Sequence, residues 1–430
     1  MTKPLKIAVA GLGTVGAGTI KLLFDHADMI SARCGRNIVC TAVAARNRAK
    51  DRGVSMTEQQ WFDDPVTMAA QADADVIVEL IGGSSGAAKA VCETAIAHGR
   101  HVVTANKALL AVHGNDLARL AEDAGVTLAY EASVAGGIPI IKALREGLVG
   151  NKISALSGIL NGTCNYILTT MRETGRDFSD VLAEAQQLGY AEADPSFDID
   201  GVDAAHKLTI LSSLAFGHKL DFAAVKSEGI RHISAEDIRL AGELGYRIKL
   251  LGIARSTEHG IEQRVYPCMV PLASPIAQVE GVFNAVEVVG DYVGRSVYEG
   301  RGAGAGPTAS AVVADLVDIA LGRSSPTFGI PATKMKPAVF ADPGKHLGAY
   351  YVRLMVRDKP GVLADVTAAL RDENVSIESV IQRSRAPDGV VPLVMTLHET
   401  EEANVTRALA RIEELETVTE PPRLIRIEGV

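Results

Sequence analysis

Acidic side chains gather ahead of one lysine in residues 189–207, which read GYAEADPSFDIDGVDAAHK. Five carboxylates precede Lys207, and they are Glu192, Asp194, Asp198, Asp200 and Asp203. Pro195 and Gly201 predict a turn-rich loop, and from about Asp200 the pattern predicts an apolar helix with Asp200 as its N-cap. On that helix Asp203 and Lys207 are four residues apart and share one face. Such a segment could hold the ammonium of a small zwitterion with carboxylates while the lysine stands beside one of its oxygens.

An Asp–Lys pair at this spacing is most often a surface ion pair of little energetic weight. The residues that follow Lys207 argue against that interpretation here, because the helix is apolar on most sides (Leu208, Ile210, Leu211, Leu214 and Ala215). We therefore expect the helix to be buried, and buried charges are kept paired or put to use.

A glycine-rich turn near the N-terminus predicts a dinucleotide site. Residues 5–10 form a short apolar run typical of a strand buried on both faces. The run leads into G-x-G-x-x-G and then into a helical pattern, and the motif comprises Gly11, Gly13, Thr14, Val15 and Gly16 as candidate cofactor-binding residues. The glycines permit a tight turn, backbone approach to a pyrophosphate and close helix–strand packing. The bland alternative is a simple glycine-rich βα turn.

The end of the next strand, expected over residues 37–45, bears on cofactor choice. An acidic residue there would bind the ribose 2′-hydroxyl of NAD, but the chain has Arg46 and Arg48 instead. Arginine suits a 2′-phosphate, so the sequence favours NADP(H), with NAD(H) still possible. Both arginines could also be solvated loop charges.

Two further strand ends should reach the same crevice, because strand carboxyl ends line the ligand site of such sheets. Ile81 and Gly82 end the strand expected at residues 75–81, and Thr104 and Lys107 follow the strand that begins near residue 101. The alternative for Lys107 is a lysine at a helix start with no functional role, although a positive charge is disfavoured at a helix N-terminus.

The central stretch resembles the signature of homoserine dehydrogenases. The matching residues are Ala185, Gly189, Tyr190, Asp194, Pro195, Asp198, Ile199, Gly201, Asp203 and Lys207. Residues 104–107 (TANK) and 161–166 (NGTCNY) resemble further segments of that family, and we expect the latter to form a loop. The resemblance implies NAD(P)H-dependent interconversion of L-aspartate 4-semialdehyde and L-homoserine, within threonine, methionine and isoleucine biosynthesis.

The same resemblance implies roles for particular residues. Lys207 would donate and accept the proton at the substrate oxygen, and Lys107 would meet both cofactor and substrate. The implied substrate-binding residues are Glu192, Asp198, Asp203 and Gly189, and Gly306 lies in a glycine loop that would touch the cofactor. A structural monovalent cation, Na⁺ or K⁺, would be bound by Glu131, Val134, Gly136 and Ile138.

The C-terminal residues 349–430 read βαββαβ and resemble an ACT domain, a module that binds amino acids. Gly361 and Asn374 are the expected effector-binding residues, and threonine is the usual effector in the family. The alternative is a pure dimerisation domain, since ferredoxin-like folds serve many roles.

The fold class expected is therefore α/β with five segments. Residues 1–133 should form a Rossmann-type, doubly wound parallel sheet, and residues 134–306 an α+β substrate and dimerisation domain with an open, largely antiparallel sheet. Residues 307–322 should form a helix that returns to the nucleotide domain, residues 323–348 a proline-containing linker, and residues 349–430 the ferredoxin-like ACT domain. We expect a homodimer or homotetramer.

Composition restricts the class of partner. A chain of 430 residues with a net charge of −9 and no basic patch argues against nucleic acid or an anionic membrane. The apolar runs are too short to span a bilayer or to form a signal peptide. Five scattered cysteines without a CxxC pair indicate reduced thiols, no structural zinc site and a cytoplasmic location.

Two rival functions remain open from the sequence. One is a semialdehyde dehydrogenase with Cys164 as nucleophile, although no histidine with a recognisable basic role accompanies that thiol. The other is a non-catalytic sensor of dinucleotide and amino acid. Intact Lys207, Lys107 and glycine motifs argue against the sensor.

Overall fold

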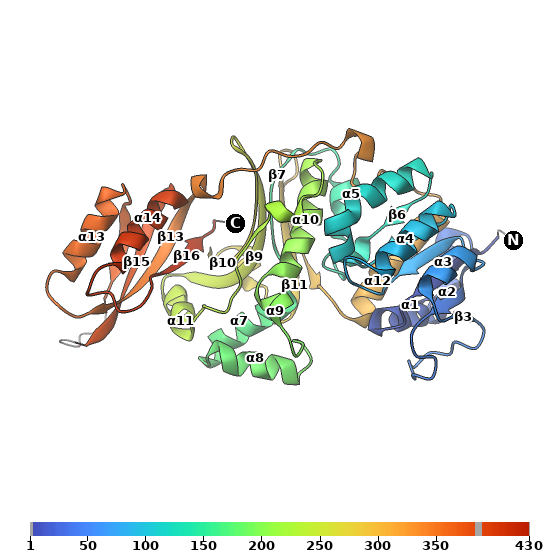
Figure 1. Ribbon diagram of the computed structural model, residues 1–430, viewed down its shortest axis with the longest axis horizontal. Coiled ribbons are helices and arrows are strands. Elements are labelled where there is room, and N and C mark those ends of the chain that lie inside the picture. Colours follow the sequence, from blue (N-terminus) through green and yellow to red (C-terminus); the bar gives the residue numbers. More distant parts are fainter. Residues whose placement is uncertain (1–2, 383–388, 430) are drawn as a thin grey trace.

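The computed structural model describes residues 3–382 and 389–429. Three regions follow one another along the long axis in Figure 1: the N-terminal sheet at the right, a central region, and the C-terminal region at the left. Among the described residues, no helix has the length and apolar character needed to cross a membrane.

The N-terminal region is built on a six-stranded parallel sheet with the order β3-β2-β1-β4-β5-β6. Its strands are β1 (Leu5–Ala10), β2 (Ile38–Ala44), β3 (Gln60–Phe62), β4 (Val76–Glu79), β5 (His101–Thr104) and β6 (Leu128–Ala129). The apolar run of residues 5–10 is the central strand, as expected for a segment buried on both faces. Strand order reverses beside β1, which confirms the Rossmann-type prediction and places the ligand crevice at the carboxyl ends of these strands.

Helices cover both faces of this sheet. One face carries α3 (Pro65–Gln71), α4 (Ala87–Ala97) and α5 (Lys107–Asp123), and the other carries α1 (Thr14–Asp25), α2 (Ala27–Cys34) and α12 (Ala305–Ala320). Figure 1 shows the orange α12 beside the blue α1, although α12 comes late in the chain. The contact is close, since a Cβ added at Gly18 of α1 would lie 3.1 Å from the carbonyl oxygen of Ala305.

The central region is an antiparallel sheet with helices packed on it. Its strands run in the order β12-β11-β7-β9-β10, with bounds β7 (Ile153–Ile159), β9 (Tyr246–Thr257), β10 (Gly260–Pro271), β11 (Phe283–Gly290) and β12 (Gly294–Arg301). The short β8 (Lys226–Ser227) pairs with β10 in parallel. The helices are α7 (Gly162–Thr174), α8 (Phe178–Gln187), α9 (Ser196–Ile199), α10 (Val202–Phe216) and α11 (Ala235–Glu243).

Two local expectations in this region are wrong. Residues 161–166 do not form a loop: they begin α7, because the Asn161 side chain caps the helix by accepting a hydrogen bond from the Cys164 N–H at 2.8 Å. Asp200 is not the N-cap of α10. That position belongs to Gly201 with φ of 82°, and Asp200 instead forms an ion pair with Arg231 at 2.5 Å.

The C-terminal region has the expected ferredoxin-like order, β16-β13-β15-β14. Its elements are β13 (Leu347–Arg357), α13 (Val362–Asp372), β14 (Ile377–Ile381), β15 (Val390–Glu401), α14 (Glu402–Glu413) and β16 (Arg423–Ile427). The sequence did not predict that β16 pairs in parallel with β10, through Cys268–Arg426 and Met269–Ile427. The central and C-terminal regions therefore share one ten-stranded sheet.

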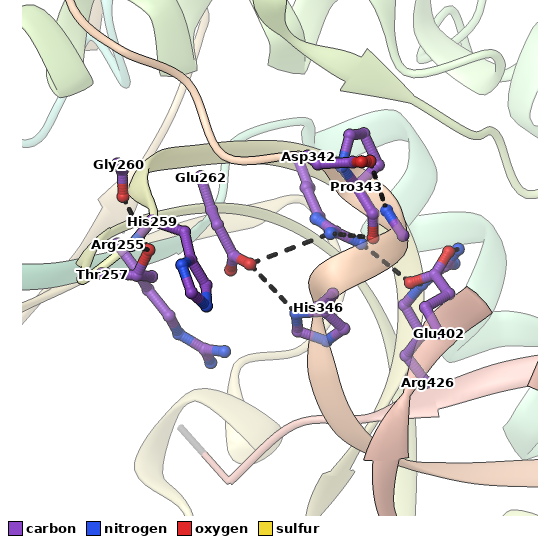
Figure 2. A network of polar contacts seen from close by, with 12 residues as sticks. Arg255, Thr257, His259, Gly260, Glu262, Asp342, Pro343, His346, Glu402 and Arg426 are labelled. Carbon is purple, nitrogen blue, oxygen red and sulfur yellow. Dashed lines mark hydrogen bonds and ion pairs between the residues drawn. The ribbon is translucent and has the colours of Figure 1, made fainter. Parts of the chain in front are cut away.

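Ion pairs surround this junction (Figure 2). Arg426 of β16 donates to Glu402 at 2.6 Å. It also donates to Glu228 of the central region at 3.0 Å. Arg264 of β10 also donates to Glu402, at 2.8 Å. His346 lies 3.4 Å from Glu262. Because the side chains of Arg264, Arg426 and Glu402 are mostly buried, their charges depend on one another for compensation.

Residues 323–346 run between α12 and β13 with no regular element beyond two short 3₁₀ turns, η5 (Ala332–Lys334) and η6 (Pro343–Lys345). Side chains of the nucleotide region hold this segment. Glu122 accepts hydrogen bonds from the N–H groups of Thr327 and Ala332 at 3.2 and 2.7 Å, and Tyr130 donates to the Thr327 carbonyl at 2.7 Å. The buried ring of Phe328 packs 5.2 Å from the Tyr130 ring. The segment is thus attached to the surface of the fold along its first half.

We predict that Arg426→Ala loosens the C-terminal region. The change leaves Glu402 and Glu228 without their shared cation, and removing one partner of a largely buried ion pair costs on the order of 3 kcal/mol. Urea unfolding followed by circular dichroism measures this loss. Arg371→Ala is the matched control, because Arg371 is 75% exposed and pairs only with its neighbour Asp372 among the ion pairs of the described residues. Its effect should stay within about 0.5 kcal/mol, and equal losses in the two variants would contradict the prediction.

Candidate active site

One buried carboxylate joins two lysines from different regions of the chain. Asp203, in the first turn of α10, accepts from Lys207 Nζ through Oδ2 at 2.7 Å. Its other oxygen, Oδ1, lies 2.8 Å from Lys107 Nζ at the start of α5. The helical spacing of Asp203 and Lys207 predicted the first contact, and only the packing of α5 against α10 supplies the second.

Residues that follow β7 hold this centre in place through hydrogen bonds. Asn161, which caps α7, donates through Nδ2 to Asp203 Oδ2 and to Asp198 Oδ1, both at 2.8 Å. The carbonyl of Leu160 accepts from Lys207 Nζ at 2.6 Å. Asn161 was noted in the sequence only as part of a motif, and its clamp on two carboxylates was missed. An asparagine that immediately precedes a helix is the signal that could have identified it.

The pKa values of the three charged side chains in this centre are shifted in different directions. Burial works against ionisation of Asp203, yet Lys207 and Lys107 hold the pKa of Asp203 well below its usual range. Burial also lowers the pKa of Lys207, which Asp203 opposes and Lys107 reinforces. Although burial disfavours its charged form, Asp203 raises the pKa of Lys107. Lys207 is therefore the lysine whose proton is more easily removed, and a group with a pKa nearer neutrality is the better proton carrier.

A cleft of about 430 Å³ opens over the two lysines. Its lining includes Asp198 and Gly189, which the resemblance implies as substrate-binding residues, together with Asn284 and the loop Gly302–Gly304. Burial and the neighbouring Asp203 raise the pKa of Asp198. Glu192 is exposed and lies outside the lining of the cleft.

The glycine-rich turn has the geometry that a dinucleotide needs. Gly11 has φ of 99°, and a Cβ there would lie 2.5 Å from the Leu80 carbonyl oxygen. A Cβ on Gly16 would lie 2.1 Å from the Gly11 carbonyl oxygen, so the helix and turn can pack only with glycine. Gly13 faces open space. Thr14 and Val15 begin α1, and no side chain of the described residues caps that end, so its N–H groups remain available to phosphates.

A buried glutamate organises the neighbouring strand ends. Glu79 accepts from the Thr104 hydroxyl at 2.6 Å and from the N–H groups of Ile81 and Gly82 at 2.7 and 3.2 Å. Thr104, Ile81 and Gly82 therefore have structural partners in addition to any contact with a cofactor. Asn106 caps α5 by accepting from the Leu109 N–H at 3.0 Å. Lys107 occupies the next position, which explains a lysine at a helix start: its ammonium reaches across to Asp203.

The arginines that follow β2 lie on the surface. Arg46 is exposed, and the Arg48 guanidinium lies 5.8 Å from the centre of the Trp61 ring. Arg52, which the sequence analysis missed, stands 5.5 Å from the same ring and donates through Nε to the Leu12 carbonyl at 3.1 Å. Arg52 therefore connects this loop to the glycine turn. The signal that could have identified Arg52 is its place in the same basic loop as Arg46 and Arg48.

Gly306 lies in the first turn of α12 rather than in the preceding loop. The glycine that adopts a left-handed conformation there is Gly304, with φ of 116°, which is the N-cap of α12. Gly304 lines the cleft, so the loop before α12 is the part of this segment that reaches the site.

The residues expected to bind a cation lie on one buried turn after β6. The Glu131 carboxylate accepts from the N–H groups of Ile141 and Lys142, both at 2.9 Å. Val134 and Ile138 are buried on either side of Gly136. The described residues contain no group of three or more His, Cys, Asp or Glu side chains able to hold a metal.

The two expected effector residues are apart within one chain. Gly361 caps the N-terminus of α13 with φ of 99°, and Asn374 follows its C-terminus with φ of 57°. At 1.5 Å per residue, α13 separates them by about 16 Å. A single small effector cannot contact both residues of the same copy.

Cys164 lacks the surroundings of a nucleophile. Its side chain is fully buried, and burial raises the pKa of the thiol well above its usual value. Its Sγ donates to the Asp198 carbonyl at 3.3 Å. A reactive cysteine needs a stabilised thiolate and access to substrate, so this geometry disfavours the thiol-dependent alternative.

The fold and the site together define a class of enzyme. A doubly wound parallel sheet binds dinucleotides at its switch point, and here the crevice of that sheet opens onto lysines that can move a proton. This is the arrangement of a nicotinamide-dependent oxidoreductase.

Comparison with known proteins gives the family. The family model for homoserine dehydrogenase matches residues 139–317, its NAD binding domain model matches residues 11–131, and the ACT domain model matches residues 350–417. A homoserine dehydrogenase of Pseudomonas aeruginosa is 49% identical over 435 residues, covering 99% of each chain. One from Neisseria gonorrhoeae is 48% identical over 434 residues, covering 100% of this chain and 99% of that one. The crystal structure of a homoserine dehydrogenase from Thiobacillus denitrificans has a TM-score of 0.94 at 46% identity, covering 99% of each chain. The chain belongs to the homoserine dehydrogenase family of NAD(P)-dependent oxidoreductases.

We predict that Asp203→Asn destabilises the fold in a pH-dependent manner. Folding lowers the pKa of Asp203, so its stabilising contribution is present above the unfolded pKa of about 4 and is lost as the pH falls through the folded value. At pH 7 the variant brings two lysines together without their carboxylate, at a cost on the order of 3 kcal/mol. Calorimetry from pH 7 to pH 3 should show the gap between wild type and variant narrowing as the pH falls. Asp180→Asn, at an exposed position on α8, is the control. A gap that does not change with pH would refute this prediction.

Proposed function

We propose that this chain interconverts L-aspartate 4-semialdehyde and L-homoserine, with NADP(H) preferred and NAD(H) accepted. The observation that carries the proposal is the carboxylate of Asp203 shared by Lys107 and Lys207, at 2.8 and 2.7 Å, inside a cleft beside the nucleotide fold. In a biosynthetic setting this reaction serves the formation of threonine, methionine and isoleucine.

Lys207 is the proposed proton donor in aldehyde reduction and the proton acceptor in homoserine oxidation. Its lowered pKa supports this role. Lys107, held charged by Asp203, positions and polarises the same substrate oxygen. The reduced nicotinamide, when bound, supplies the hydride. A proton carrier fixed at the oxygen contributes roughly 10²–10⁴-fold to the rate.

The substrate ammonium is assigned to the carboxylate side of the cleft. Asp198 lines the cleft and keeps one oxygen on Asn161 at 2.8 Å. Asp203 neutralises the charges of the two lysines. Gly189 offers backbone groups to the substrate, and Glu192 contributes negative charge from outside the lining of the cleft. These acidic groups supply the counter-charge that an ammonium needs when it leaves water.

Regulation and assembly complete the proposal. The ACT domain is proposed to bind an amino-acid effector, and threonine is the usual effector in the family. The chain is proposed to form a homodimer or homotetramer, in which Gly361 of one copy and Asn374 of another contact the same effector. Their separation along α13 supports this division between copies.

A monovalent cation is proposed on the turn that contains Glu131, Val134, Gly136 and Ile138. The Glu131 carboxylate accepts one N–H bond on each oxygen and keeps further lone pairs for the cation, beside backbone carbonyls of the turn.

The deciding experiment measures NADPH oxidation with L-aspartate 4-semialdehyde. We expect turnover by the wild type and a fall in kcat of at least about 10²-fold in Lys207→Ala, because the proton carrier is lost. Lys226→Ala, which removes an exposed lysine of β8, should keep the wild-type rate. A wild type without turnover on either cofactor would overturn the proposed reaction, and an active Lys207→Ala would overturn the role of that lysine.

Cofactor preference has its own test. Arg46→Ala should raise KM for NADPH by about 10-fold while leaving KM for NADH unchanged, because a hydrogen bond between charged groups is lost only with the 2′-phosphate. Steady-state kinetics with both cofactors measure the ratio. Arg33→Ala removes an exposed arginine from the last turn of α2 and serves as the control. Equal changes for NADPH and NADH would show that Arg46 does not read the phosphate.

A further inference from the structure

The buried amide of Asn284 lies at the cleft. Asn284 of β11 is 1% exposed, and neither its Oδ1 nor its Nδ2 has a partner among the residues that the structure describes. An amide withdrawn from water without compensation is costly, and buried polar groups nearly always find partners. The amide therefore points to a polar group that a ligand brings.

The position of Asn284 is next to the lysine centre. β11 pairs antiparallel with β7, and Ala285 lies opposite Ile159. Asn284 is thereby beside Leu160, whose carbonyl accepts from Lys207 Nζ at 2.6 Å. Asn284 also lines the cleft together with Lys107 and Lys207.

Two glycines flank the amide and offer it no side chain. A Cβ on Gly302 would lie 2.2 Å from Asn284 Cγ, so any other residue at position 302 would displace the amide. A Cβ on Gly162 would lie 3.4 Å from Asn284 Oδ1 and 2.7 Å from the Val282 carbonyl oxygen. The backbone of Gly302 therefore packs closely on the amide, and Gly162 lies beside it without a side chain.

The path of a dinucleotide leads to this amide. The loop Gly302–Gly304 runs into α12, and Ala305 at the start of α12 lies against Gly18 of α1, the helix that follows the glycine-rich turn. A dinucleotide that extended from that turn to Lys107 and Lys207 would run along this loop, whose Gly302 packs against Asn284. The nicotinamide end of such a cofactor would then be the part nearest to Asn284.

The Asn284 side chain and the carboxamide of a nicotinamide ring are both neutral amides with one acceptor oxygen and one NH₂ donor. We propose that Asn284 binds the carboxamide of the nicotinamide ring, donating from Nδ2 to its oxygen and accepting at Oδ1 from its NH₂. The substrate ammonium is assigned above to Asp198 and the reacting oxygen to Lys107 and Lys207, whereas a neutral amide pairs in both directions with another neutral amide. The inference rests on the proposed oxidoreductase function and assigns the residue that sets the orientation of the ring.

The test compares NADPH with its 3-acetylpyridine analogue, which keeps the carbonyl and lacks the NH₂ group. Equilibrium binding to the full chain, followed by cofactor fluorescence for NADPH and by competition for the analogue, gives a Kd for each without turnover. We expect wild type to bind NADPH about 10-fold more tightly than the analogue, as the loss of a hydrogen bond in a dry site predicts. In Asn284→Ala this ratio should fall to near one, with weaker NADPH binding.

Controls separate this role from others. Asn151→Ala changes an asparagine whose side chain bonds Leu148 and Val293 on the far end of the sheet, and it should keep the wild-type ratio. Asn284→Ser serves if Asn284→Ala fails to fold, as judged by thermal unfolding. A ratio that stays at the wild-type value in Asn284 variants, or a rise in KM for the semialdehyde with NADPH binding intact, would overturn the proposal. A wild type that discriminates the analogue but shows no turnover would instead overturn the proposed reaction and leave Asn284 as a cofactor ligand.

Discussion

The shared carboxylate of Asp203 is the interaction on which the arrangement of the site depends. It holds Lys207 of the central region and Lys107 of the nucleotide region at hydrogen-bond distance, so it fixes the two regions in a single geometry. Two ammonium groups this close would repel strongly in a buried setting, and a single ionised carboxylate between them removes that cost. The clamp of Asn161 on Asp203 then prevents the carboxylate from turning away.

The remaining parts of the site divide the work between the two regions. The nucleotide region contributes the glycine turn, which lets a backbone approach phosphates, and the buried Glu79, which ties the ends of β4 and β5 together. The central region contributes the ends of β7 and β11, where Leu160 and Asn284 lie. Catalytic groups placed at the ends of rigid strands keep their geometry better than groups on free loops.

The C-terminal region is attached directly to segments that adjoin the site. Pairing of β16 with β10 extends the central sheet, and Arg426 reaches Glu228 in the segment that follows β8. That segment contacts the approach to α10: Ser227 donates to the Asp200 carbonyl at 2.9 Å, and the Ile230 N–H donates to the Ile199 carbonyl at 2.9 Å. Contiguous polar contacts therefore lead from the ACT domain to the residues beside Asp198.

The sequence by itself determined the features that depend on near neighbours in the chain. The glycine spacing between a strand and a helix determined the dinucleotide turn, and the i, i+4 spacing determined the Asp203–Lys207 pair, because both follow from local backbone geometry. The βαββαβ order likewise determined the ferredoxin-like region. Only the tertiary structure decided the contact of Lys107 with Asp203, the pairing of β16 with β10 and the burial of the Asn284 amide at the cleft. These join residues far apart in the chain, and their partners are chosen by packing, which no local pattern encodes. The start of α7 at Gly162 was missed although its signal is local, namely the Asn161 cap. The N-cap at Gly201 was missed for a different reason, since Asp200 is engaged in an ion pair with the distant Arg231.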